Sequence, residues 1–66
     1  MQITVNGHTR NESQPLTLAE LLERQHLDAR RVAVELNRKI VPRQLYRDTQ
    51  LTDADVLEIV TLVGGG

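Results

Sequence analysis

The feature of this sequence best suited to chemistry is its glycine-rich end. Three of the four glycines are Gly64, Gly65 and Gly66. Because glycine lacks a side chain and accepts any backbone conformation, such an arm can enter a channel too narrow for other residues. A terminal carboxylate, with a reference pKa of ~3.3–3.7, is ionised at neutral pH and can therefore act as a nucleophile. The pattern predicts a flexible tail that presents the Gly66 carboxylate to a partner; the alternative is a loose chain end without a role.

Other side chains offer weaker candidates for chemistry. The chain has no cysteine, so no thiolate can bind a metal or attack a substrate. His8 and His26 lack metal-ligand spacing and are predicted to lie on the surface. Asp53 and Asp55 are typical of a solvated turn before a strand, and Ser13 would need a placed base to act as a nucleophile. We therefore expect no catalytic residue and no metal site.

Length and composition restrict the class of protein. A chain of 66 residues and 7.5 kDa allows one domain, expected over residues 1–63. Its 39% hydrophobic and 26% charged residues are typical of a globular protein. The net charge of −1 gives no global argument for nucleic-acid binding. With neither a long apolar run nor a signal peptide, we expect a cytoplasmic protein without a membrane span. The small size favours a carrier, adaptor or binding module over an enzyme.

The first half of the chain predicts a hairpin and a helix. Residues 1–7 alternate apolar and polar, as in a half-buried strand, and end in the turn dipeptide Asn6-Gly7. The polar return arm, residues 8–13, is an edge strand or a loop. Thr17 and Glu20 form a capping-box pattern that starts a helix running from Leu18 to about His26. Glu20 and Arg24 are spaced as an ion pair on that helix.

The second half predicts three more strands. Residues 32–37 alternate, with Val32, Val34 and Leu36 pointing inward, and a turn then leads to a short strand over residues 39–41. Residues 43–50 predict a turn-rich connection with one helical turn. A turn over residues 53–55 precedes the last strand, residues 56–63. One helix covering one face of one sheet is an α+β roll, with the strands that flank the helix running parallel.

The last strand leaves apolar side chains exposed. If Glu58 faces solvent, the two-residue period places Val60 and Leu62 on the same outer face and turns Leu57 and Ile59 into the core. An exposed apolar pair beside the tail predicts a partner-docking contact at Val60 and Leu62.

Six of the eight basic residues lie in residues 30–47. They are Arg30, Arg31, Arg38, Lys39, Arg43 and Arg47. We interpret them as a solvated face; the alternatives are a surface for an acidic partner or weak RNA contact. The lack of stacking aromatic residues argues against RNA.

The whole chain resembles the ThiS family, the sulfur carriers of thiamine biosynthesis. The similar segments are Met1-Gln2-Ile3-Thr4-Val5-Asn6-Gly7, Leu18-Ala19-Glu20-Leu21-Leu22, Val34-Glu35-Leu36-Asn37, Ile40-Val41-Pro42-Arg43, Asp53-Ala54-Asp55 and the terminal glycines. One departure is Ala54, where the family usually has glycine; it should strain the turn slightly without affecting function.

The resemblance implies a β-grasp, ubiquitin-like roll with a mixed sheet of four to five strands on one main helix. It also implies that an E1-like adenylyltransferase of the ThiF type adenylates Gly66 with ATP. Sulfur that comes from cysteine through a desulfurase would then give a thiocarboxylate, which a thiazole synthase of the ThiG type consumes. The chain would be a co-substrate with no permanently bound cofactor, not an enzyme. Because it has no cysteine, the terminal carboxyl is the one plausible sulfur-carrying group.

Three alternatives remain. A molybdopterin-synthase small subunit is also a β-grasp sulfur carrier, although usually longer and richer in aromatic residues. A ubiquitin-like modifier would be found conjugated to other proteins through Gly66. A plain β-grasp interaction module would tolerate deletion of the tail.

Overall fold

The computed structural model describes residues 1–13 and 15–62 as five strands, one α-helix and two short 3-10 helices. The predicted tail residues Gly64, Gly65 and Gly66 lie outside the described residues. In chain order the elements are β1 (Gln2–Val5), β2 (His8–Asn11), α1 (Leu18–Arg24), η1 (Ala29–Arg31), β3 (Val32–Leu36), β4 (Lys39–Ile40), η2 (Arg43–Asp48) and β5 (Val56–Thr61). None of the described helices is long and apolar enough to cross a membrane.

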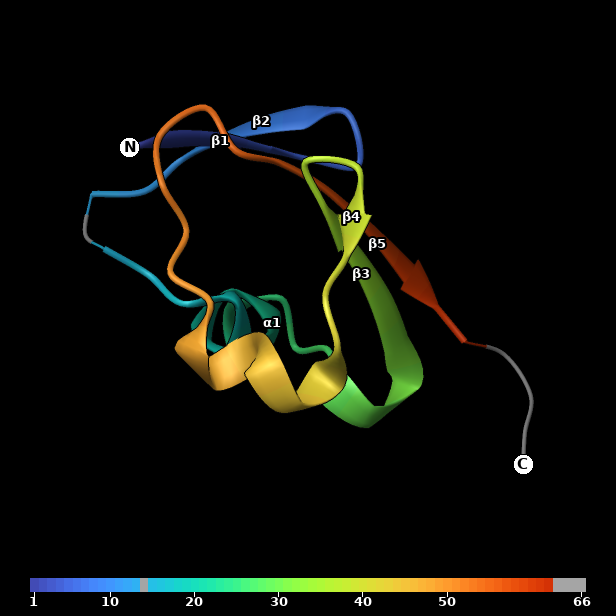
Figure 1. Cartoon of the computed structure of the whole chain (residues 1–66). Coiled ribbons are helices and arrows are strands. Elements are labelled where there is room, and N and C mark those ends of the chain that lie inside the picture. Colours follow the sequence, from blue (N-terminus) through green and yellow to red (C-terminus); the bar gives the residue numbers. More distant parts are fainter. Residues whose placement is uncertain (14, 63–66) are drawn as a thin grey trace.

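The five strands form one mixed sheet in the order β2-β1-β5-β3-β4. The pair β1 and β5 is parallel, whereas the other neighbouring strands are antiparallel. The strands that flank the helix, β2 and β3, therefore point the same way as predicted, but β1 and β5 lie between them. Figure 1 shows α1 and η2 together on one side of this sheet, which is the predicted α+β roll.

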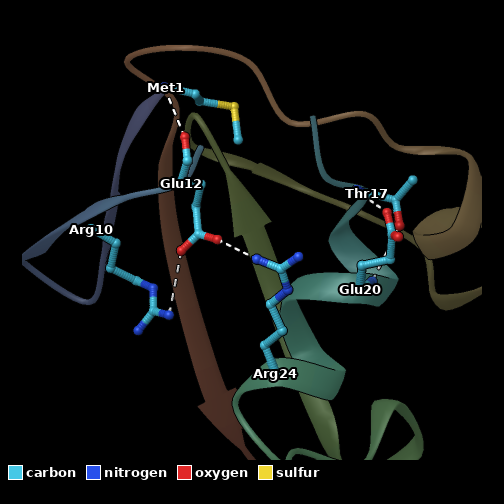
Figure 2. Close-up of polar contacts among 6 residues, drawn as sticks. All are labelled: Met1, Arg10, Glu12, Thr17, Glu20 and Arg24. Atoms are coloured by element: carbon cyan, nitrogen blue, oxygen red, sulfur yellow. Dashed lines mark hydrogen bonds and ion pairs between the residues drawn. The ribbon is translucent and has the colours of Figure 1, made fainter. Parts of the chain in front are cut away.

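The helix begins where the capping box predicts. The Glu20 amide donates to the Thr17 hydroxyl at 3.1 Å, and the Thr17 amide donates to the Glu20 carboxylate at 2.8 Å (Figure 2). The helix ends at Arg24, two residues earlier than predicted, because His26 takes a left-handed φ of 59° that cannot continue an α-helix. The predicted ion pair of Glu20 with Arg24 is wrong, since Arg24 binds Glu12 instead.

The capping box predicts a pH dependence of stability. The Thr17 amide holds the pKa of Glu20 below its ordinary value of 4.5. Because the unfolded chain lacks this bond, its contribution is present above pH 4.5 and is lost as the pH falls through the folded pKa. We expect Glu20→Gln to reduce the acid-induced drop in the free energy of unfolding, measured by urea titration at several pH values. Glu23→Gln, on the same helix, is the control; equal curves for both variants would contradict the prediction.

The core is aliphatic with a single aromatic side chain. Tyr46 in η2 is buried, and this burial raises the pKa of its hydroxyl. The other buried hydrophobic residues are Ile3, Val5, Leu16, Leu18, Leu21, Leu22, Val32, Val34, Leu51, Leu57 and Ile59. They come from the inner face of the sheet, from α1 and from the segments around them, as the two-residue and helical periods predict. Leu57 and Ile59 belong to this core, which therefore packs against the inner face of β5.

Candidate functional site

Strand β5 leads to the predicted tail and lies in the middle of the sheet. Its backbone pairs with β1 at Thr4 and Val5, and with all of β3 from Val32 to Leu36. Beyond the end of β5, the Leu62 amide still donates to the Arg31 carbonyl at 2.7 Å. The backbone is therefore held by hydrogen bonds as far as Leu62. Figure 1 shows β5 running beside β3.

Asparagines in two turns hold β5 through their side chains. Asn6 has a φ of 50° in the predicted hairpin turn, and its amide group accepts from the Ile59 N–H at 2.7 Å and donates to the Ile59 carbonyl at 3.1 Å. Asn37, also with a φ of 50°, accepts from the Val56 N–H at 2.9 Å. The sequence predicted a turn near each of these asparagines, but not the bonds from their side chains to β5, whose partners lie 19 or more positions away.

The loop before β5 corrects one prediction. Asp55 is buried rather than solvated. Its carboxylate accepts from the Thr52 amide at 2.7 Å and from the Asn37 side chain at 2.9 Å. Ala54 has a φ of 72°, a left-handed conformation that suits glycine better, so the departure noted in the sequence does fall at a strained position. These contacts fix where β5 begins.

The outer face of the sheet carries the predicted docking residues. Val60 is 59% exposed and Leu62 is 56% exposed, whereas Leu57 and Ile59 are buried, as the two-residue period requires. Val56 and Ile40 are also exposed. Ile40 was missed because its strand is only two residues long and shows no period. The exposure of Val60 and Leu62 is confirmed, and their role in docking stays a prediction.

A buried carboxylate joins β2 to the helix. Glu12 accepts from Arg24 at 2.6 Å and from Arg10 at 3.5 Å, and its carbonyl oxygen accepts from the Met1 ammonium at 2.9 Å (Figure 2). Its side chain is almost fully buried, whereas both arginines reach solvent. No local pattern reveals this cluster, because its members belong to different elements. It holds the edge of the sheet against α1.

The remaining predicted residues are exposed. His8 and His26 lie on the surface, and residues 1–13 and 15–62 contain no cluster that could hold a metal ion. All six basic residues of the 30–47 segment are exposed, and their interpretation as a solvated face stays a prediction. Arg30 and Arg31 contact Asp28, and the hydrogen bonds from Arg30 hold the pKa of that carboxyl below its ordinary value.

Comparisons with family models, curated proteins and solved structures all find similarity to ThiS proteins. The model of the ThiS family matches residues 3–66. A thiazole synthase of Paramagnetospirillum magneticum is 44% identical over 66 residues, where this chain spans 20% of that protein's length. The sulfur carrier protein ThiS of Bacillus subtilis is 42% identical over 50 residues, covering 76% of each chain. The crystal structure of the thiamine biosynthesis protein ThiS from Geobacter metallireducens superposes with a TM-score of 0.85 at 33% identity and covers all of both chains.

Proposed function

The chain belongs to the ThiS family, the sulfur carriers of thiamine biosynthesis, and we propose that it carries sulfur as a thiocarboxylate on the carboxyl carbon of Gly66. The observation that carries this proposal is the reach of the family match, which extends to residue 66 and so includes the terminal glycines. The absence of cysteine supports it, because the sequence offers no thiol that could hold a persulfide.

The proposed chemistry needs an activated carboxyl group. The Gly66 carboxylate attacks the α-phosphorus of ATP, and pyrophosphate leaves as the acyl-adenylate forms. The desulfurase takes sulfur from cysteine as a persulfide and releases alanine. The persulfide then attacks the carbonyl carbon and AMP leaves, and a thiol reductant cleaves the resulting acyl disulfide to give the thiocarboxylate. An E1-like adenylyltransferase of the ThiF type would supply the acid, base and enclosure for these steps. The chain itself would act as a co-substrate, with Gly64 and Gly65 passing through the partner's channel.

A thiazole synthase of the ThiG type is the proposed acceptor of the sulfur. The thiazole synthase of Paramagnetospirillum magneticum contains a segment similar to this entire chain. A carrier-like segment within that enzyme supports the proposal that carrier and synthase act together.

The test of the function is a mass measurement. The intact protein is incubated with the ThiF-type adenylyltransferase, ATP, cysteine, a cysteine desulfurase and a thiol reductant, and then weighed by mass spectrometry. We expect the mass to rise by the difference between sulfur and oxygen, and only when ATP is present. Conjugates of the chain with other proteins would instead indicate a ubiquitin-like modifier, and no mass change would contradict the sulfur-carrier mechanism.

The docking role of the outer face gives a separate prediction. Val60→Asp and Leu62→Asp place a charge where a partner would bury an apolar side chain, so each should weaken adenylyltransferase binding at least about fivefold. The melting temperature should change little, because both side chains are already more than half exposed. Calorimetric titration measures the affinity, and Leu45→Asp on η2 is the control. Normal binding by both outer-face variants would show that this patch is not the interface.

A further inference from the structure

We propose that the partner binds the outer face of the sheet with a cationic side chain, an arginine, inserted between Glu35 and Glu58. This inference rests on the proposed function, because it specifies the chemistry of the surface that the adenylyltransferase must present there. Neither glutamate was singled out in the sequence for this role; the pairing of β3 with β5 brings them together.

The register of the sheet places the two glutamates side by side. Glu35 and Glu58 are direct partners in the antiparallel pairing of β3 with β5. Side chains at such positions share a face, with Cβ atoms about 4.5–5.5 Å apart. On β3 and β5 this face is the outer one, because Val34, Leu57 and Ile59 point into the core. Two carboxylates therefore extend together from the middle of the sheet.

Nearby cations neutralise this carboxylate pair only in part. Among residues 1–13 and 15–62, neither Glu35 nor Glu58 lies within ion-pair distance of a basic side chain. Arg38 lines the same open hollow as both glutamates, so one positive charge accompanies two negative ones. Lys39 opposes Leu36 in the β3–β4 pairing, one position out of phase with Glu35. The Asn37 side chain, which also lines the hollow, already bonds Asp55 and Val56.

Apolar side chains surround the two carboxylates. Ile40 is the direct partner of Glu35 on the other side of β3, and Val56 and Val60 flank Glu58 along β5. All three are about half exposed or more, at 69%, 46% and 59% respectively. A partner that covers them would exclude water from the glutamates, and charge interactions strengthen when water is removed.

The arrangement requires a cation from outside the chain. Like charges directly opposite each other in a sheet destabilise it, so the pair does not serve the fold. Burying two carboxylates with only the one positive charge of Arg38 beside them, under a purely apolar partner, would cost far more. A guanidinium group carries five donors in a planar fork and can bond both carboxylates at once. The complementary partner surface is therefore apolar with an arginine at its centre.

The test compares binding with stability in matched variants. The probes are Glu35→Gln, Glu58→Gln and the double variant, with Glu23→Gln on the helix side as the control. Each is titrated with the ThiF-type adenylyltransferase at low and high salt. We expect the double variant to raise Kd about tenfold or more and to weaken the salt dependence, with smaller effects of the single variants. The melting temperature should stay constant or rise, because the like-charge contact is removed.

Other outcomes would overturn the inference. The inference is wrong if the double variant binds like the wild type. It is also wrong if the loss of binding is matched by a lower melting temperature, because that result indicates a structural role for the glutamates. A wild-type protein that does not bind the adenylyltransferase would overturn it as well. The sulfur mass gain is measured in parallel and tests the proposed function separately. If wild type and double variant both accept sulfur normally, with equal KM, then this inference is wrong while the proposed function stands.

Discussion

Deletion of Gly66 should abolish sulfur transfer to this chain and leave its fold intact. The deletion moves the terminal carboxylate back by one residue, up to ~3.3–3.6 Å in extended chain. A misplacement of only ~1 Å can lower a rate about a hundredfold, so activity should fall below detection. The melting temperature should not change, because the described core residues all lie between Ile3 and Ile59. Mass spectrometry after incubation with adenylyltransferase, ATP and the sulfur source measures the outcome.

A lengthened chain is the matched control for this deletion. One extra glycine after Gly66 leaves all three tail glycines in place but moves the carboxylate forward, and it should also block transfer. If both altered chains gain sulfur as readily as the intact protein, then the position of the carboxylate is unimportant. The glycines would then return to the interpretation of a loose chain end.

Replacement of Leu22 by alanine should produce the largest loss of stability among the changes considered. Leu22 is 1% exposed in the core beneath the sheet, and deletion of such a side chain costs about 2–5 kcal/mol. A domain of this size is expected to be stable by only roughly 3–10 kcal/mol, from about 0.05–0.15 kcal/mol per residue. The substitution therefore removes a large share of the total, which urea denaturation followed by circular dichroism measures directly.

Leu45→Ala is the control for this substitution. Leu45 lies in η2 on the same side of the sheet but is 47% exposed, so its truncation should cost less than about 1 kcal/mol. Equal losses for the two leucines would mean that Leu22 does not occupy the core. The binding of the adenylyltransferase to folded Leu22→Ala should remain close to that of the wild type, because the outer face is unchanged.

The sequence alone determined the elements and the faces of the strands. The alternation in β1, β3 and β5 predicted which side chains are buried, and the pair Thr17 and Glu20 located the first turn of the helix. These rules work because they depend on neighbours within four positions, where the geometry of a helix or a strand is the same in every protein. The end of the helix escaped them, since the left-handed turn at His26 has no strong local signal.

Tertiary structure alone decided which distant side chains meet. The sequence gives no register between β3 and β5, so it could not place Glu35 opposite Glu58. It predicted a solvated Asp55, but packing brings Asn37 and Thr52 to that carboxylate and allows its burial. The helical spacing predicted an ion pair of Arg24 with Glu20, but Arg24 binds Glu12, the residue that follows β2. Such contacts depend on the folded path of the whole chain, because a buried polar group is stable only where every segment around it satisfies its hydrogen bonds.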